Sequence, residues 1–536
     1  MGGAVSVAHP GRCRPRPNRT PTGCTGAAPA QPQPKEDTII RSLKTPRRRT
    51  ATALAALATT AAVTLTVTGG AAGAAPASGA AASPPPCSLP HPKIGTTKPI
   101  TVTTIGQAYS CIYGHYYAAA TLDDRVLLAA AFGGLTQQLD RLGQDQPGAT
   151  LPALTGNHDS DWAAFAALYQ RIISKLPADD RQQAAEATMT AMINALNNNH
   201  SYWEHPHFFP GCHHGQCPPY GLGLYTTPDS TMAQTDPGVM LPPLYINYVD
   251  PLSPAGRHGV RPGDVITKVN GSAPFTDGTP SPGVMNLLNQ HYPQHQPVRL
   301  TLRWPATGAT RTITLTPAIY STGPLGPPVT SKLLPGHIGY VQMYGFDSGT
   351  DTDTGKGCNA GCEVRTALSA LEKKAKLRGV IVDVRGNHGG APSGVASMVG
   401  LFEHGRPWGY SCTVAGKCTP NYPNSHMPLL HLPLAVLTDR DCQSACDAFA
   451  SAVKDLHLGT LIGTRTSGII GAAAVFFRIL NDGSALQLTT KTFLDAGHVL
   501  SDGIGVAPDY YIPLTAKDVA TGHDPDVAKA LALLGR

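Results

Sequence analysis

The sequence predicts a multidomain protein of the α/β (α+β) class, and three observations along its 536 residues support this. Residues 118–202 have apolar positions three and four apart, the period of an amphipathic helix. Residues 219–317 change to short alternating stretches between Gly-, Pro- and Asn-containing turns, which is typical of strands. Residues 334–515 then alternate strand and helix, as in a largely parallel sheet covered by helices.

Residues 1–77 resemble a leader that is removed on export. Three arginines at 47–49 precede an apolar run at 51–67, and small residues then offer cleavage sites near Ala74 and Ala77. A membrane anchor is the alternative, but the run is short and rich in Thr and Ala. We therefore expect a secreted or cell-envelope protein, exported by the Sec or the twin-arginine route.

Composition bears on partners and compartment. Residues 1–74 hold ten of the 41 Lys and Arg and two of the 35 Asp and Glu, so 31 basic and 33 acidic residues remain. This nearly neutral body argues against nucleic acid or a membrane surface as a stable partner. Ten of the 12 cysteines follow the leader, which indicates disulfide bonds in an oxidising compartment. Pairing between sequence neighbours is our expectation, with other connectivities open, among Cys87, Cys111, Cys212, Cys217, Cys358, Cys362, Cys412, Cys418, Cys442 and Cys446.

The chain divides where its composition and periodicity change. The expected parts are a disordered extension or mis-assigned start (1–40), a Pro/Ala/Ser-rich linker (78–110), a helical part (111–210), a β-rich module (219–317), an α/β core (334–515) and a C-terminal helix or tail (516–536). Expected helices lie at 122–142, 161–176, 181–203, 281–291, 361–377, 391–402 and 444–456. Expected strands of the core lie at 336–346, 378–387, 432–441, 461–466, 475–481 and 485–494.

Ser444 follows an apolar strand across a short polar turn and begins a helix. A hydroxyl there lies at the positive end of the helix dipole, beside backbone N–H groups that have no helical partner. Those groups, the N–H of Ala445 first, are suited to hold the oxyanion of an acyl-transfer intermediate. A helix cap is the commoner reason for a serine at such a position, and no G-x-S-x-G elbow is present.

Other segments supply possible partners for Ser444. Gly389 and Gly390 follow a buried strand, where a backbone N–H can approach a substrate carbonyl, although a tight turn explains them equally well. His200 stands at a helix end, where a capping or core role is commoner than that of a base. A serine nucleophile still needs an imidazole and an orienting acceptor, for which Asp502 and Asp509 are candidates.

Taken in chain order, the motifs resemble peptidase family S41, which includes C-terminal processing proteases, tricorn core proteases and related retinoid-binding modules. The resemblance covers about residues 110–515. It implies a core of the crotonase/ClpP-like type, an inserted PDZ-like domain and serine peptidase activity. It rests on NNNHSYW, YGLGL, GVRPGDVITKVNG, VDVRGNHGG, DRDCQSACDAFA, GTRTSG and SDGIGVAPD.

The resemblance assigns Ser444 as the nucleophile, the N–H of Ala445 as one oxyanion donor and that of Gly389 or Gly390 as the other. Processing proteases of the family carry a lysine base in a TxGKG segment, but RTSGIIG places Ile469 there. Lys454 is no substitute, because it lies on the helix that follows the serine.

The chain therefore resembles the tricorn-like branch, whose base is a histidine, and His200 matches it. In that branch a carboxylate, usually Glu, precedes GVxPD, and a polar residue precedes the histidine. Asp502 and Asn199 take these positions. Because Asp is one methylene shorter than Glu, Asp502 would lie closer to the base or act through Ser201, Asn199 or a water.

Gly221, Leu222, Gly223 and Leu224 match the carboxylate-binding loop of PDZ domains, and an exposed strand edge beside them would accept a peptide by β-augmentation. A degenerate structural insert is the alternative.

A cluster of metal-type ligands, HPHFFPGCHHGQC, follows the helical part. These residue types suit zinc, but a Cys212–Cys217 disulfide is the simpler interpretation, and we expect no metal and no organic cofactor. The potential ligands are His205, His207, Cys212, His213, His214 and Cys217.

The sequence thus predicts an exported serine endopeptidase with peptide or protein substrates. A non-catalytic binding protein on the same scaffold and a hydrolase of non-peptide acyl substrates are the alternatives. Cys442 and Cys446 flank Ser444, and we expect one or both to form disulfides that brace its turn.

Overall fold

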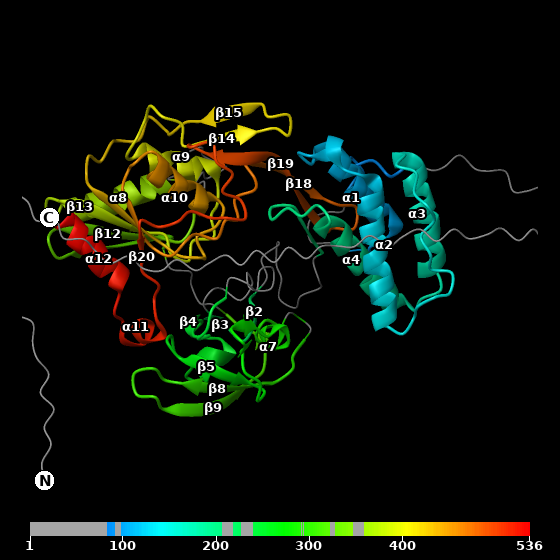
Figure 1. The fold of residues 1–536 in the computed structure, drawn as a ribbon, viewed down its shortest axis with the longest axis horizontal. Helices are drawn as coiled ribbons and strands as arrows, with labels where there is room; N and C mark the ends of the chain where they lie inside the picture. Colours follow the sequence, from blue (N-terminus) through cyan, green and yellow to red (C-terminus); the bar gives the residue numbers. More distant parts are fainter. Residues whose placement is uncertain are drawn as a thin grey trace, which may run out of the picture. The chain divides into compact units, whose positions relative to one another are not determined.

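The structure is a computed structural model that describes residues 83–91, 98–205, 218–226, 240–290, 292, 294–321, 327–346 and 359–535. The chain divides into two compact units, residues 1–75 and 76–536, and all described residues belong to the second. The leader expected at 1–77 lies outside the described residues. The mixture of helical bundle, antiparallel strands and parallel sheet confirms the predicted multidomain α/β class (Figure 1).

Helices dominate the N-terminal part, where those expected at 122–142 and 161–176 are present. The third, expected at 181–203, ends at Asn194, and Tyr202–Glu204 form a strand instead. The described helices are α1 (Val102–His115), α2 (Asp124–Arg141), α3 (His158–Ile173) and α4 (Ala178–Asn194), with a 3-10 turn at Ala119–Thr121. The side chains of Asp123 and Asn157 cap α2 and α3 by accepting hydrogen bonds from first-turn N–H groups.

Helix α1 differs from the expectation, since it begins within the segment predicted as linker. Its β-branched start, ITVTT, favours extended structure locally. The helix forms nevertheless because Ile105, Tyr109 and Ile112 lie on one face and are fully buried against the other helices.

The β-rich module has its own apolar core and one helix where 281–291 was expected. Strands β5, β8 and β9 form an antiparallel sheet, and β3 pairs with β4. The strands are β2 (Tyr220–Gly221), β3 (Leu224–Thr226), β4 (Ile246–Val249), β5 (Val265–Val269), β6 (Phe275–Thr276), β7 (Thr279–Pro280), β8 (Val298–Arg303), β9 (Thr310–Leu315) and β10 (Ala318–Ile319). The helices are α6 (Pro254–Arg257) and α7 (Pro282–Leu288).

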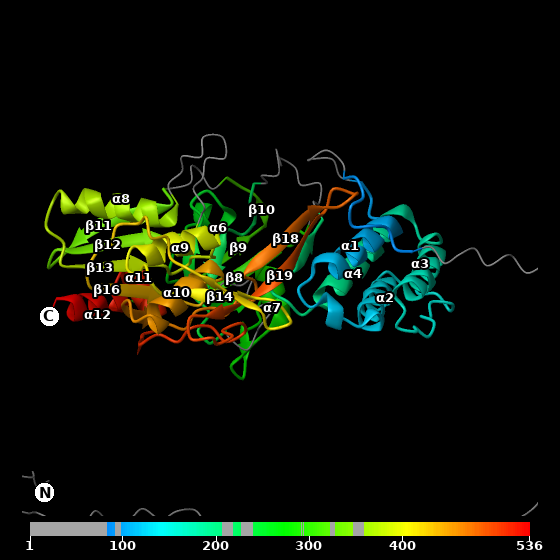
Figure 2. The same cartoon turned by 90° about the horizontal axis from the view of Figure 1, so that it is seen from above.

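A six-stranded sheet of order β11-β12-β13-β16-β17-β20 forms the α/β core, and every neighbouring pair except β11–β12 is parallel. Figure 2 shows β11, β12, β13 and β16 side by side in this order. The strands are β11 (Val329–Leu334), β12 (Ile338–Met343), β13 (Gly379–Asp383), β16 (Leu434–Thr438), β17 (Thr460–Gly463) and β20 (Tyr510–Tyr511). The helices are α8 (Ala360–Glu372), α9 (Pro392–Gly400), α10 (Ala445–Asp455), α11 (Ala516–Thr521) and α12 (Pro525–Leu534).

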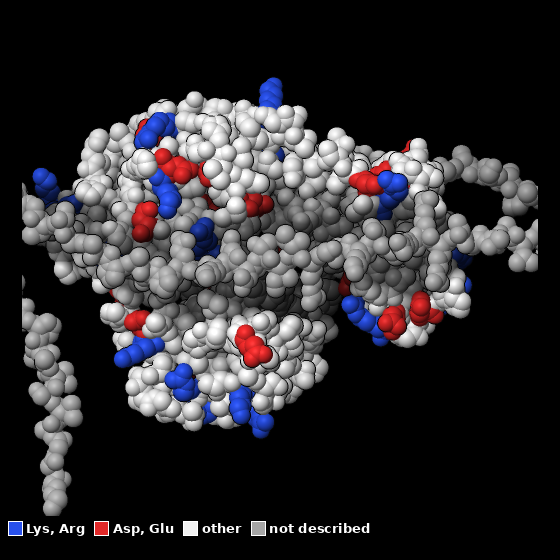
Figure 3. Space-filling model, viewed as in Figure 1, with Lys and Arg blue, Asp and Glu red and all other residues white. Residues whose placement is uncertain are grey.

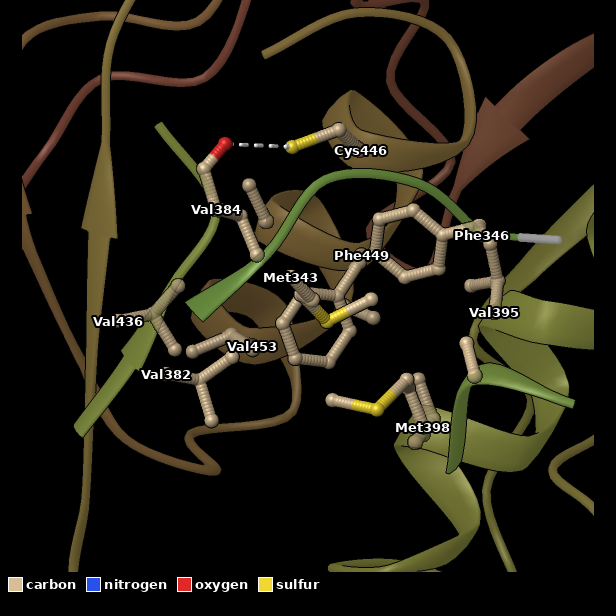
Figure 4. Packing of buried hydrophobic residues seen from close by; sticks show 14 of the residues in the cluster. Met343, Phe346, Val382, Val384, Val395, Met398, Val436, Cys446, Phe449 and Val453 are labelled. Atoms are coloured by element: carbon tan, nitrogen blue, oxygen red, sulfur yellow. Dashed lines mark hydrogen bonds between the residues drawn. The ribbon is translucent and has the colours of Figure 1, made fainter. Parts of the chain in front are cut away.

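The central strands are buried on both faces, as their continuous apolar runs predict. Val382 of β13 and Val436 of β16 face α9 and α10, where they pack with Phe449 (Figure 4). The alternate residues Ile381 and Ala435 belong to the core on the opposite face, to which α12 contributes. The N-terminus of α10 is therefore anchored in a packed interior.

A second, antiparallel sheet of order β1-β19-β14-β15 contains strands that had been expected to close the core. Strands β18 and β19 lie within one or two residues of the predicted 475–481 and 485–494, but they pair with each other outside the parallel sheet. One end of β19 pairs with β1, directly after His200, and the other end with β14. The strands are β1 (Tyr202–Glu204), β14 (Gly409–Cys412), β15 (Cys418–Asn421), β18 (Ala474–Ile479) and β19 (Ala485–Asp495).

Disulfide bonds join sequence neighbours in the described residues. The pairs are Cys87–Cys111, Cys412–Cys418 and Cys442–Cys446. Cys362 is also disulfide-bonded, while Cys212, Cys217 and Cys358 lie outside the described residues.

Charge and hydropathy add two observations. Basic and acidic side chains are interspersed on the face that Figure 3 shows, without a large region of one sign. Within the described ranges, every helix is too short or too polar to cross a bilayer.

Candidate active site

Ser444 occupies a sharp turn between β16 and α10. It is the N-terminal cap residue of α10, with φ 55° and ψ −113°, a sparsely populated conformation that costs a non-glycine residue about 1–3 kcal/mol. Its N–H donates to the carbonyl of Ile469 (2.8 Å) and to the carboxylate of Asp447 (2.9 Å). The serine thus has the helix-cap position, but its strained backbone goes beyond what a cap requires and is held by neighbouring elements.

Asp447 is the main side chain that holds this turn, and sequence reasoning did not single it out. It is fully buried and also accepts hydrogen bonds from Ser467 Oγ and the N–H of Gly468, both at 3.0 Å. Burial raises the pKa of Asp447, while these hydrogen bonds act in the opposite direction. The available signal was the S-x-x-D spacing of a capping box from Ser444.

His200, Asn199 and Asp502 form a chain of hydrogen bonds that ends at Ser444. Nε2 of His200 lies 2.9 Å from Ser444 Oγ, and Nδ1 lies 2.8 Å from Asn199 Oδ1. Nδ2 of Asn199 donates to Asp502 Oδ1 at 2.7 Å. The structure therefore brings together all four residues that the sequence proposed. Asp502 reaches the imidazole through Asn199, one of the routes left open.

The amide bridge fixes the imidazole tautomer. An ionised carboxylate only accepts hydrogen bonds, so Asp502 requires the NH₂ end of Asn199. The amide oxygen is then left for His200 and accepts the proton of Nδ1. Nε2 consequently has a free lone pair directed at the hydroxyl of Ser444, as a general base needs.

The turn that carries His200 is held by β19. Asn198 Oδ1 accepts hydrogen bonds from the N–H of His200 (3.1 Å), Ser201 Oγ (3.0 Å) and Thr489 Oγ1 (2.7 Å). Gln487 Nε2 donates to the carbonyl of His200 at 3.0 Å. Asn198 was another residue missed from the sequence, although asparagine is typical of such tight turns.

Burial lowers the pKa of His200, and the negative charge of Asp502 acts against this shift. The imidazole therefore stays neutral to a lower pH than an exposed histidine. A neutral ring is the form that can accept the proton of a serine hydroxyl.

The glycine turn lies directly beside the serine. Gly389 has φ 96°, and a Cβ added there would lie 2.8 Å from Ser444 Cβ and 3.0 Å from the nitrogen of Ala445. Only glycine fits at this position without displacing the nucleophile turn. The close approach agrees with the expectation that a substrate carbonyl would meet backbone groups here.

Of the two glycines proposed as oxyanion donors, Gly390 alone has an N–H without a partner among the described residues. The N–H of Gly389 donates to Asn387 Oδ1 at 2.9 Å. Within the described residues, the N–H groups of Gly390 and Ala445 have no hydrogen-bond partner. Asn387 is buried, and its Nδ2 donates to the carbonyl of Met343 at 3.0 Å, so it fixes the turn between two strands.

The remaining candidates serve other roles. Ile469 stands at the family's lysine position and contributes only its carbonyl to Ser444. Lys454 Nζ donates to the carbonyl of Ala507 at 2.6 Å and pairs with Asp509 at 3.3 Å. Asp509 also accepts from the N–H of Leu461, so this acid stabilises the end of the sheet and does not belong to the site.

The loop Gly221–Leu224 lies in the β-rich module, and no described hydrogen bond links it to the four residues around Ser444. Its carbonyls face the module: that of Leu222 accepts from Ala255, and that of Gly223 from Asp250, both at 2.9 Å. Because C=O and N–H of a trans peptide point in opposite directions, the N–H groups of Gly223 and Leu224 face away from these partners.

The metal-type cluster falls mostly at 206–217, outside the described residues. Among those described, no group of three or more His, Cys, Asp and Glu side chains is arranged to hold a metal ion. His205, the one described member, lies 3.8 Å from both Glu186 and Asp482.

Comparisons with known proteins agree with the resemblance that the motifs indicated. The model of peptidase family S41 matches residues 337–512. "Carboxyl-terminal-processing peptidase 2, chloroplastic" of Arabidopsis thaliana is 29% identical over 273 residues, 49% of this chain and 48% of that protein. "C-terminal processing peptidase, chloroplastic" of Tetradesmus obliquus is 28% identical, covering 64% of this chain and 70% of the relative. The chain thus spans about half the length of the first relative.

A tricorn protease of Thermoplasma volcanium is 32% identical over 163 residues, 30% of this chain and 15% of that protein. Among solved structures, a photosystem II D1 C-terminal processing protease matches 77% of this chain and 98% of its own, with 23% identity and a TM-score of 0.44. The match to the family model and the named relatives agree with each other. Residues 337–512 thus match peptidase family S41, a family of serine-type peptidases.

Proposed function

We propose that this protein is an exported serine endopeptidase that forms an acyl-enzyme on Ser444 with His200 as general base. The observation that carries the proposal is the 2.9 Å separation of His200 Nε2 and Ser444 Oγ, with the other imidazole nitrogen held by Asn199. This is the constellation of nucleophile, base and orienting group that acyl transfer requires.

In the proposed reaction, His200 accepts the hydroxyl proton as Ser444 Oγ bonds to the scissile carbonyl carbon. The oxyanion that forms accepts hydrogen bonds from the N–H groups of Gly390 and Ala445. His200 then gives the proton to the leaving amine as the C–N bond breaks. Water, deprotonated by the same imidazole, attacks the acyl-enzyme and releases Ser444.

Strain at Ser444 supports this assignment. The left-handed backbone is maintained at a cost by Asp447 and by Ile469, which indicates a requirement other than folding. Helix α10 begins at the next residue, so the positive end of its dipole lies where the oxyanion forms.

The β-rich module is proposed to bind the C-terminal end of a peptide substrate. Outward N–H groups of Gly223 and Leu224 suit a carboxylate, and among the described strands β3 pairs only with β4, which leaves an edge for an added strand. Export is proposed from the leader and from the disulfide bonds of the described chain, which persist in oxidising compartments.

A fluorophosphonate probe tests the proposal, because it reacts with an activated serine whatever the natural substrate. We expect the purified protein to be labelled at Ser444, as mapped by peptide mass spectrometry, and to cleave members of a broad peptide library. Ser444→Ala and His200→Ala should each lower kcat by about 10⁴- to 10⁶-fold. Lys454→Ala is the control and should retain activity.

Two outcomes favour the alternatives. A protein that is neither labelled nor active on any peptide is a binding protein on this scaffold. Labelling at Ser444 combined with cleavage of esters but of no peptide identifies a hydrolase of other acyl substrates.

A further inference from the structure

Gly471 lies against the hydrogen bond that connects Asn199 with Asp502. A Cβ added at Gly471 would lie 2.8 Å from Asn199 Oδ1 and 2.8 Å from Asp502 Oδ2. A Cβ atom essentially never lies within 3.0 Å of another heavy atom, so one of the two side chains would have to move. The glycine therefore contacts the two members of the site that orient His200 without touching the nucleophile.

The backbone conformation does not explain why this residue is glycine. Gly471 is absent from the described glycines with positive φ, whereas Gly468, three residues earlier, has φ 77°. An alanine is thus compatible with the local backbone at Gly471, and the nearest atoms that its Cβ would meet all belong to the side chains of Asn199 and Asp502. The side chains of the candidate site, and not the local backbone, therefore restrict position 471 to glycine.

The preceding residue contacts the same carboxylate. The N–H of Ile470 donates to Asp502 Oδ1 at 3.2 Å, the oxygen that also accepts from Asn199 Nδ2 at 2.7 Å. Both Ile470 and Gly471 are buried, whereas Asn199 is exposed. The backbone of 470–471 forms the inner wall against which the exposed amide is held.

We propose that Gly471 is a positioning residue: its missing side chain lets the backbone close over the Asn199–Asp502 pair and hold the amide in the orientation that His200 needs. A methyl group there pushes Asn199 towards solvent. The amide oxygen then leaves Nδ1, and water competes for both partners. This inference rests on the proposed role of His200 as base.

The test is Gly471→Ala in the full chain. Because misplacing a catalytic group by about 1 Å can cost 10²-fold, we expect kcat and the rate of fluorophosphonate labelling to fall by about 10- to 100-fold. KM should stay within about twofold. In an Asn199→Ala background, Gly471→Ala should cause no further loss, so the double variant should be no slower than Asn199→Ala alone.

Two glycine variants serve as controls. An added Cβ at Gly133, in α2, meets no atom, whereas one at Gly459 lies 2.5 Å from the backbone of Leu434, away from the site. Gly133→Ala should match the wild type, and Gly459→Ala should lower the melting temperature while preserving kcat. A Gly471→Ala enzyme within twofold of wild-type kcat, or a loss that adds fully to that of Asn199→Ala, overturns the inference.

A measurement independent of turnover separates this inference from the proposed function. With ¹⁵N-labelled histidine, the wild type should show His200 as the Nδ1–H tautomer with a downfield proton that is hydrogen-bonded to the amide. Gly471→Ala should lose this resonance while the other histidine signals persist, and its retention contradicts the inference. If the fluorophosphonate probe does not label the wild type, the proposed peptidase function is wrong. The NMR result then still tests whether Gly471 positions Asn199.

Discussion

The two halves of the candidate site are built by different means. Ser444 has a strained backbone that is held by the buried carboxylate of Asp447, and it lies inside the short loop closed by the Cys442–Cys446 disulfide. His200 is oriented by the side chain of Asn199, which is exposed, and by the half-buried Asp502. The nucleophile geometry is therefore part of the folded core, whereas the base geometry depends on a few polar side chains near the surface.

This difference implies a difference in response to substitution. Changes around Ser444 alter stability and activity together, because the same contacts hold the core. Changes around His200 alter activity with little effect on stability, because surface hydrogen bonds contribute only modestly to folding.

Asn199→Ala removes the acceptor that fixes the tautomer of His200. We expect kcat to fall by about 10²- to 10³-fold, less than the roughly 10⁴-fold loss when the charged Asp of a Ser-His-Asp triad is neutralised, because Asn199 is itself uncharged. The melting temperature should stay nearly unchanged. Steady-state kinetics and thermal unfolding measure the two quantities. Asn199→Ser, which keeps a hydroxyl able to accept and donate, should recover part of the loss; equal loss in both variants contradicts the bridge.

Asp502→Ala removes the charge at the far end of the bridge. Because the amide then loses one hydrogen bond to a charged group, we expect kcat to fall by about 10- to 30-fold, less than for Asn199→Ala. The double variant should be no worse than Asn199→Ala alone, because both residues act through one chain of contacts. A larger loss at Asp502 than at Asn199 is the result that would show a separate role for the carboxylate.

Replacing Cys442 and Cys446 together by alanine tests the nucleophile half. The closed loop is short, so the chain-entropy relation gives about 2 kcal/mol of lost stability. We expect a several-fold fall in kcat as the turn loosens, with the stability change measured by denaturant unfolding. If the double variant or the reduced wild type, with both thiols counted as free, keeps full activity and stability, the disulfide does not brace the turn.

The pH dependence of kcat/KM gives the smallest effect. Burial lowers the pKa of His200 from its ordinary value of 6.5, so the neutral base persists at lower pH and the acid limb should lie below pH 6.5. The charge of Asp502 raises the pKa of His200, so Asp502→Asn should move this limb to still lower pH. A limb that moves upward in this variant contradicts the proposed coupling.

The sequence predicted most of the fold because each element carries its own pattern. Apolar runs in β13 and β16 and the helical period of α2 to α4 are local signals. The exception at α1 arose because burial overrode its β-branched start. The pairing of β18 and β19 outside the parallel sheet was not predictable, because strand partners are chosen by contacts distant in sequence.

For the site, motif order placed Ser444, His200, Asn199 and Asp502 together, but their connections needed three dimensions. The choice between Gly389 and Gly390 depended on where the side chain of Asn387 points. The importance of Gly471 was invisible in the sequence, because it follows from two oxygen atoms that come from positions 199 and 502.

The length of strand β19 sets the spacing between the part of the site that carries His200 and the part that carries Ser444. Its residues Ala485–Gln487 pair with β1 beside the base, and Thr492–Asp495 pair with β14, which directly follows the core residue Trp408. One inserted residue between these stretches would shift the two partners by about 3.4 Å and reverse the faces of the following side chains. That shift exceeds the 2.9 Å between Nε2 and Oγ. Surface loops tolerate changes in length, whereas an extra residue in this strand would have to be taken up by a β-bulge for base and nucleophile to stay together.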